Sequence, residues 1–412
     1  MTTYCSSRFN TKGTLFDLAL FGGAQTFDHP LHVGRPNLPD RARFHARIDE
    51  MLDRNWLSND GPLVQELECR VAHRLGVRHC ILTCNGTAGL EIMARAAGLR
   101  GEVIVPSFTF IATAHALRWQ GITPVFCDID PMTHTLDPNR IEDSITERTT
   151  AILGVHLWGQ PCDTESLESI AQRYGLDVFY DAAHAFGCSH SGQMIGNFGR
   201  AEVFSLHATK VFQAAEGGAI VTNDDALAAK ARVIRSFGFS GPDRVIDVGI
   251  NGKMSEVSAA MGLCCLENLD EFIDVNRRNH NAYCEALCGV AGIRFYRHDE
   301  TEKRNYQYIV LEVDSKETGI DRDALLRLLQ SENILARRYF YPGCHRTEPY
   351  LSCSSSQLPE TEYLAGRILQ LPTGMAIGPA EIVRICDLLK FAVSHGAEIA
   401  RRIEGGSALP DS

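Results

Sequence analysis

Short, almost continuously apolar runs alternate with helical stretches between residues 80 and 221. The runs occupy residues 80–84, 102–106, 124–127, 151–155, 177–180, 202–205 and 218–221. A strand that is apolar at nearly every position is buried on both of its faces. That is typical of a mainly parallel sheet covered by helices on both sides. The pattern therefore predicts an α/β fold with a mainly parallel central sheet.

Helical spacing of apolar residues separates these runs and continues beyond them. Pro62 follows the turn at residues 59–61 and is well placed to begin a helix. The expected helices span residues 40–54, 62–75, 87–99, 110–119, 255–276, 322–329 and 380–393. Residues 306–313 alternate between apolar and polar types, which predicts a half-exposed strand.

We therefore expect two domains joined by one long helix at residues 255–276. The large domain spans residues 1–270, and a smaller α+β domain spans residues 271–403. Residues 351–357 form a polar loop, and the polar stretch 404–412 is expected to be a flexible tail.

Composition excludes several classes of protein. The net charge of -11 argues against nucleic acid or an anionic membrane as the main partner. The 14 cysteines include no Cys-x-x-Cys pair, so neither zinc nor a disulfide framework is expected. No apolar run is long enough to span a bilayer, and the first residues lack a signal-peptide pattern. The chain is expected in a reducing cytoplasm.

A lysine and an acid mark the candidate active site. Asp181 ends one apolar run, and Lys210 follows the next, five residues after Ser205. This arrangement suits pyridoxal phosphate (PLP), because a lysine amine forms a Schiff base with it and an acid keeps its pyridine nitrogen protonated. The alternative is an ordinary surface lysine. The flexible Gly217-Gly218 that follows favours the ligand site.

Three further positions each have a structural alternative. Gly86 and Thr87 lie between a strand and a helix start, where main-chain N–H groups bind phosphate; alternatively, Thr87 only caps the helix. Phe110 or Phe108 would stack on a flat ring at a strand end, or pack in the core. His184 would contact the phenolic oxygen of the cofactor or support Asp181, or be a satisfied core histidine.

Together these residues resemble the DegT/DnrJ/EryC1/StrS family of sugar aminotransferases, PLP enzymes of the aspartate-aminotransferase fold (fold type I). The similarity runs over nearly the whole chain. It includes Trp56-Leu-Ser-Asn-Asp-Gly-Pro62, Asn85-Gly-Thr-Ala88, Pro106-Ser-Phe-Thr-Phe110, Asp181-Ala-Ala-His184, Ser205-Leu-His-Ala-Thr-Lys210, Glu216-Gly-Gly218, residues 251–256 and Leu371-Pro372. One departure is Gln213-Ala-Ala215, where many members carry more Thr, Gly or Ser; it is expected to reshape the loop beside Lys210.

The resemblance implies a role for each site residue. Lys210 carries the Schiff base and shuttles the proton, and its freed amine is expected to be neutralised by cationic surroundings. Asp181 holds the pyridine nitrogen, His184 lies near the phenolic oxygen, and Phe110 stacks on the ring. Gly86, Thr87 and Ser205 hold the phosphate. Asn251, which the residues alone would leave as a possible helix cap, reaches the cofactor phosphate of a neighbouring subunit. This implies a homodimer with shared active sites.

Four more segments narrow the resemblance to one branch of the family. They are Phe21-Gly-Gly-Ala24, residues 31–37, Val155-His-Leu-Trp-Gly159 and residues 336–345. This branch aminates C4 of dTDP-4-keto-6-deoxy-D-glucose with L-glutamate as donor, in antibiotic-sugar and surface-glycan pathways.

The same resemblance places the nucleotide sugar near four residues of this chain. Arg337, Arg338, Tyr339 and His345 are the candidates for substrate contacts, because an arginine suits a diphosphate. Alternatively, at least one of the two arginines only forms an ion pair at the surface. Amination at C3, or of a keto-cyclitol, stays open. So does a non-catalytic PLP- or sugar-binding regulator.

Overall fold

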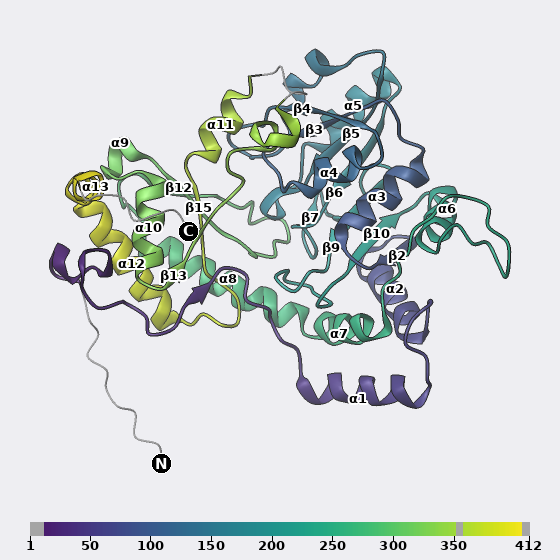
Figure 1. Ribbon diagram of the computed structural model, residues 1–412, viewed down its shortest axis with the longest axis horizontal. Helices are drawn as coiled ribbons and strands as arrows, with labels where there is room; N and C mark the ends of the chain where they lie inside the picture. Colours follow the sequence, from purple (N-terminus) through teal and green to yellow (C-terminus); the bar gives the residue numbers. More distant parts are fainter. Residues whose placement is uncertain (1–11, 352–356, 406–412) are drawn as a thin grey trace.

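The computed structural model describes residues 12–351 and 357–405. Two sheets organise it, and Figure 1 shows them side by side with helices around each. The polar loop predicted at residues 351–357 lies mostly outside the described residues, and so does most of the predicted tail. Gly405 of that tail ends a helix. No helix in the described ranges is long and apolar enough to cross a lipid bilayer.

The larger sheet has seven strands and is mainly parallel, as predicted. Its order is β2 (His79–Thr83), β10 (Gly218–Thr222), β9 (Ala201–Ser205), β6 (Asp177–Asp181), β5 (Thr149–Val155), β3 (Glu102–Pro106) and β4 (Thr123–Cys127). Only β10 runs antiparallel to its neighbours, β2 and β9. The strands are almost entirely buried, which explains their continuous apolar runs.

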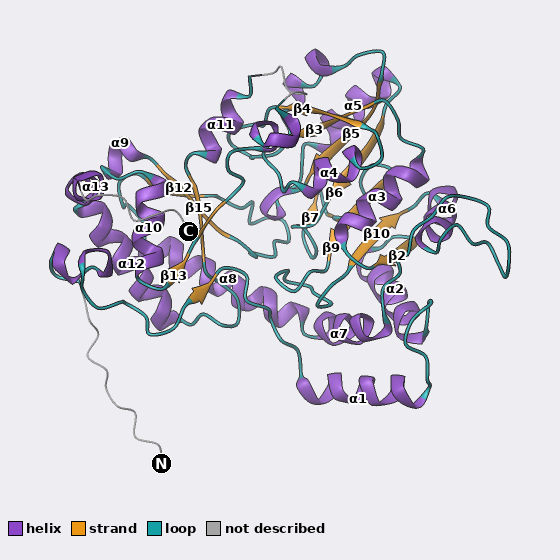
Figure 2. Ribbon diagram, in the orientation of Figure 1, coloured by secondary structure: helices purple, strands orange, loops and turns teal. Residues whose placement is uncertain are grey.

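Helices cover both faces of this sheet (Figure 2). Val105 and Val203 face a core shared with α3 (Gly86–Ala97), α4 (Ala112–Arg118) and α6 (Asp225–Arg235). On the other face, Leu82 and Phe204 pack with α2 (Pro62–Leu75) and α7 (Glu256–Glu267). α1 (Arg41–Asp53) lies outside α7, and α5 (Thr164–Tyr174) covers β5 and β6.

The long helix predicted at residues 255–276 is two helices. α7 ends at Glu267, and α8 (Leu269–Ala286) begins after one intervening residue. Asn268 lies between them with φ −101° and ψ 4°, outside the helical region, so the hydrogen-bond ladder is interrupted there. Helical periodicity on both sides of the break concealed it, because one non-helical residue does not disturb the apolar spacing.

The smaller sheet is antiparallel. Its order is β11 (Ile293–Phe295), β12 (Ile309–Val313), β15 (Ile368–Leu371) and β14 (Arg337–Arg338). The strand predicted at 306–313 begins only at Ile309, because Tyr306 has a positive φ of 48° that an extended strand does not allow. Around it lie α9 (Ser315–Thr318), α10 (Arg322–Ser331), α11 (Pro359–Ala365), α12 (Pro379–Ser394) and α13 (Gly396–Gly405).

The remaining elements are short. They are β1 (Leu31–His32), β7 (Ser189–His190), β8 (Gln193–Met194), β13 (Ile334–Leu335), η1 (Leu15–Asp17), η2 (Ala19–Phe21), η3 (Pro138–Arg140), η4 (Glu142–Ser144), η5 (Leu157–Gly159), η6 (Cys344–Arg346) and η7 (Glu348–Tyr350).

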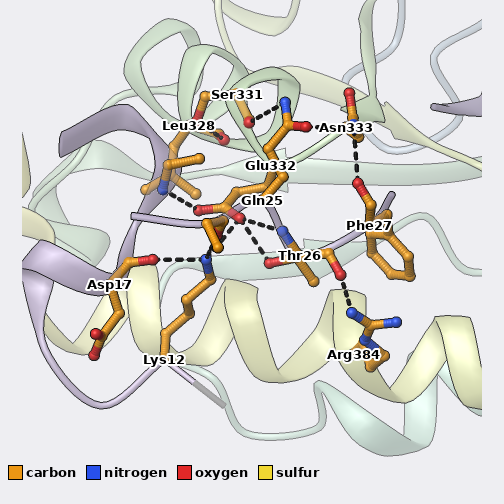
Figure 3. A network of polar contacts seen from close by, with 12 residues as sticks. Lys12, Asp17, Gln25, Thr26, Phe27, Leu328, Ser331, Glu332, Asn333 and Arg384 are labelled. Carbon is orange, nitrogen blue, oxygen red and sulfur yellow. Dashed lines mark hydrogen bonds and ion pairs between the residues drawn. The ribbon is translucent and has the colours of Figure 1, made fainter. Parts of the chain in front are cut away.

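The N-terminal segment, residues 12–38, packs against the smaller sheet's core. Leu15, Leu18 and Phe27 belong to that core, although the predicted division assigns residues 1–270 to the other domain. Glu332 fixes the segment (Figure 3): its buried carboxylate pairs with Lys12 at 2.9 Å and accepts bonds from the main chain and hydroxyl of Thr26. The domain boundary at residue 270 stays a prediction.

Candidate active site

A cavity of ≈310 Å³ opens at the carboxyl ends of the parallel strands, where ligands bind in open α/β sheets. Most of the predicted site residues line it. They are Gly86, Thr87, Phe110, Asp181, His184, Ser205, Lys210, Arg337 and Tyr339. The sheet brings them together because β6 and β9 are parallel neighbours and end at the same edge.

The start of α3 forms one wall of the cavity. Asn85, not Thr87, is the N-cap residue, and its side chain accepts a hydrogen bond from the main chain of Ala88. The main-chain N–H groups of Gly86 and Thr87 lie in the first helical turn, where helix geometry provides no acceptor. A Cβ on Gly86 would lie 3.2 Å from the Cβ of Ser205, so glycine permits this close approach. The wall is suited to an anion such as phosphate.

Asp181 lines the same cavity at the end of β6 and is buried. Its carboxylate accepts hydrogen bonds from the Thr113 hydroxyl at 2.8 Å and the main chain of Ala183 at 3.1 Å. Burial raises the pKa of Asp181, and these two bonds and Lys210 oppose that rise. A buried carboxylate held in this way is stabilised further by a cationic ligand.

Lys210 extends into the same cavity. Its Nζ donates a hydrogen bond to the Tyr308 hydroxyl at 3.0 Å. Burial lowers the pKa of Lys210 to about 8, against the opposing effect of Asp181. The amine is therefore made less basic by burial and not by cationic surroundings, which corrects the physical reason expected from the sequence.

His184 faces the cavity between aromatic rings. Its ring centroid lies 5.7 Å from that of Trp158 and 4.4 Å from that of Tyr308. Burial, and then the charge of Lys210, hold the pKa of His184 well below its usual range, so the imidazole is neutral. Its Nδ1 is buried without a partner among the described residues. A buried polar atom of this kind can bond a polar group of a ligand in the cavity.

The structure distinguishes the two phenylalanines that the sequence left as alternatives. Phe110 lines the cavity and is 60% exposed. Phe108 is fully buried and packs edge-on against Phe340, with ring centroids 5.6 Å apart. Of these two alternatives, Phe110 is therefore the one available to a flat ring in the cavity.

Two of the four candidate substrate residues line the cavity, and two do not. Arg337 and Tyr339 line the cavity, whereas Arg338 lines only an adjoining groove and pairs with Asp323 at 3.7 Å. His345 is buried outside the cavity, where its Nδ1 accepts from Ser107 at 2.6 Å and its Nε2 donates to Glu362 at 3.1 Å. The structure does not bring His345 to the site.

Asn251 is also absent from the cavity lining within this chain. It is exposed, and its side-chain oxygen accepts a bond from Lys253 at 2.7 Å. Its neighbour Gly252 accepts a hydrogen bond from the main chain of Cys84.

Sequence reasoning missed two residues that contact the site. Tyr308 bonds Lys210, and Thr113 bonds Asp181. Thr113 lies in the helix expected at 110–119. The sequence of that helix does not indicate which carboxylate the Thr113 hydroxyl bonds. Tyr308 belongs to the segment preceding β12, and only the packing of the two sheets places it beside Lys210.

The model of the DegT/DnrJ/EryC1/StrS aminotransferase family matches residues 39–390 of the chain. The chain belongs to this family. This aminotransferase is 38% identical to dTDP-4-amino-4,6-dideoxy-D-glucose transaminase of Shigella dysenteriae, over 90% of this chain and 100% of that protein. It is 34% identical to GDP-perosamine synthase of Caulobacter vibrioides, over 86% and 96%. A crystal structure of DesI in the presence of its TDP-sugar product matches 95% of this chain and 100% of DesI, with 52% identity and a TM-score of 0.92.

Pyridoxal phosphate is the cofactor of this aminotransferase. The cavity fits it. A helix start and Ser205 suit the phosphate, buried Asp181 suits a cationic ring nitrogen, and the unpartnered Nδ1 of His184 suits a polar oxygen. The amine of Lys210 is half neutral near pH 8, which suits reaction with an aldehyde.

The pKa of Lys210 predicts a pH dependence in the protein freed of cofactor. Below pH 8 the amine is mainly protonated, so its acylation rate is expected to rise about tenfold per pH unit and level off above pH 8. Mass spectrometry of peptides after timed labelling measures this rate, with exposed Lys230 as the internal control. A Lys210 profile that still rises between pH 9 and 10 would contradict it.

Proposed function

We propose that this aminotransferase converts dTDP-4-keto-6-deoxy-D-glucose to dTDP-4-amino-4,6-dideoxy-D-glucose, with L-glutamate as amino donor. The observation that carries the proposal is that one cavity is lined by Lys210, Asp181 and the start of α3. The chain that forms this cavity is 38% identical to a transaminase named for that amino sugar.

The proposed roles of the residues follow from the geometry. When bound, PLP supplies a ring that accepts electrons from the carbon that loses its proton. Lys210 removes and returns protons through Nζ, because a pKa of about 8 leaves much of the amine neutral near pH 8. Asp181 holds a proton on the pyridine nitrogen by its charge. Neutral His184 would hydrogen-bond the phenolic oxygen, and Phe110 would stack on the ring.

The substrate is proposed to enter beside β14. Arg337 and Tyr339 lie at the cavity wall, and the adjoining groove continues past Arg338 and Tyr341. A guanidinium at this position binds a diphosphate and leaves the sugar pointing toward Lys210. Because Arg338 is paired with Asp323, we assign the diphosphate contact to Arg337.

The test offers purified holoenzyme three ketones with L-glutamate: dTDP-4-keto-6-deoxy-D-glucose, a 3-keto isomer and a keto-cyclitol. Formation of 2-oxoglutarate and NMR assignment of the aminated carbon are measured. Faster turnover of the 4-ketone, with nitrogen on C4, supports the proposal. A preference for the 3-ketone or the keto-cyclitol would mean that the proposed substrate is wrong. No spectral change with glutamate alone would favour a non-catalytic binding protein.

We further propose a homodimer with shared active sites. The segment that precedes Asn251 carries apolar side chains that are exposed in the described structure. They are Phe237, Phe239, Val245, Ile246, Val248 and Ile250, of which Val248 is 70% exposed. Trp56 and Leu57 are exposed as well. A second copy of the chain would cover these residues and bring its own Asn251 toward the phosphate wall.

Mixing two inactive variants tests whether the sites are shared. Lys210→Ala and Asn251→Ala homodimers are each expected to be strongly impaired. In a 1:1 mixture after subunit exchange, half of the dimers are mixed and hold one intact site of two, so about a quarter of wild-type activity is expected. The double variant Lys210→Ala/Asn251→Ala mixed with Lys210→Ala is the control and stays inactive. A monomer in sedimentation, or no recovery on mixing, would overturn the shared site.

A further inference from the structure

The loop that carries Lys210 is fixed by a buried glutamine that follows it. Gln213 is 2% exposed, and its amide makes two bonds with the main chain. The side-chain oxygen accepts from the N–H of Ala215 at 2.6 Å, and the side-chain nitrogen donates to the carbonyl of Asn37 at 3.1 Å. One side chain therefore joins the end of the lysine loop to the N-terminal segment.

The first bond holds a strained conformation. Ala215 has φ 60°, in the left-handed region that residues with a Cβ rarely adopt. The Gln213 oxygen accepts a hydrogen bond from the N–H of this same residue. The bond therefore stabilises a left-handed backbone conformation that is unfavourable for alanine.

The second bond connects the loop to the smaller sheet. The side chain of Asn37 accepts a hydrogen bond from the main chain of Met375, in the loop after β15, at 3.0 Å. Three residues earlier, Gly34 lies so close to the lysine loop that a Cβ there would be 3.1 Å from the Cβ of Thr209. Residues 12–37 lie before the part of the chain that the family model matches.

We propose that Gln213 is a positioning residue that sets the place of Lys210 by holding Ala215 in its left-handed conformation and by joining the lysine loop to Asn37 of the N-terminal segment. The inference rests on the proposed role of Lys210. It makes residues 12–38 part of the active-site scaffold, although none of them lines the cavity.

The test replaces Gln213 by methionine, which has similar volume and neither hydrogen bond. In the cofactor-free protein, Lys210 is then expected to be less buried. The midpoint of its acylation profile rises by about one pH unit, which lowers the rate at pH 7 about tenfold. Binding of PLP, followed by absorbance, slows in the same proportion. Gln120→Met is the matched control, because it removes amide bonds to Glu91 and Ala116 far from the loop.

A second substitution separates positioning from general stability. Glycine adopts a positive φ without strain, so Gln213→Met/Ala215→Gly is expected to recover most of the lost rate. If Gln213→Met does not fold, Asn37→Ala, which loosens only the far end of the connection, is expected to move the midpoint in the same direction by a smaller amount. An unmoved midpoint in the folded variants, or no recovery with glycine, overturns the inference. If Lys210→Ala retains its transamination, the proposed function fails instead.

Discussion

Lys210→Ala is expected to abolish transamination while the protein stays folded. The substitution removes the amine that is proposed to join the cofactor and to carry the proton, and general acid–base catalysis alone contributes up to about 10⁴-fold. The rate constant of the glutamate half-reaction should fall by at least that factor, measured in single-turnover absorbance experiments. The absorbance due to the covalent link between lysine and cofactor should also disappear.

Two variants complete this experiment. Lys230→Ala removes an exposed lysine on α6 and should change neither the rate nor the spectrum. Lys210→Arg keeps a cation, but a guanidinium stays protonated, so it should be as inactive as alanine. Near-normal turnover of Lys210→Ala would refute the assignment of the central residue.

Asp181→Asn is expected to have the second largest effect. Asparagine keeps the shape and can still accept the bond from Ala183, but it has no charge to hold a proton on the ring nitrogen. An opposite charge at contact distance shifts a pKa by about 1–3 units, so the active protonation state and kcat should fall about 10- to 10³-fold. Stopped-flow measurement of the glutamate half-reaction gives this factor.

Stability distinguishes this electrostatic effect from misfolding. Burial raises the pKa of Asp181 in the cofactor-free protein, so the charged carboxylate is unfavourable there. Removing the charge should leave the free energy of unfolding of that form unchanged or higher. Exposed Asp143 provides the control through Asp143→Asn. A loss of kcat that is matched by a large loss of stability would contradict the proposed role.

The sequence predicted the larger sheet better than the rest of the fold. Six of the seven apolar runs lie within strands of that sheet, and the run at 80–84 passes the end of β2 by one residue, because a strand buried on both faces leaves a local signal. The same runs located Asp181, which follows one of them, and Ser205, which ends another. The break at Asn268 and the late start of β12 were missed, since each depends on the dihedral angles of one residue.

Contacts between distant segments account for what the sequence did not show. His345 follows an arginine-rich strand and was expected near the substrate, but Ser107 and Glu362 hold it outside the cavity. The sequence around His345 does not indicate that these two residues are its partners. The cause of the lowered pKa of Lys210 was also unpredictable, because its burial depends on residues such as Tyr308, from the segment that leads into the other sheet.

The N-terminal segment is synthesised long before the residues that hold it in place. Residues 12–32 leave the ribosome long before Glu332 and β13, which bind them and are made about 300 residues later. At roughly 5–20 residues per second, the segment waits at least about 15 seconds without its partners. Nascent chains released before residue 332 are therefore expected to leave this end of the protein open to proteolysis, whatever the state of the larger sheet.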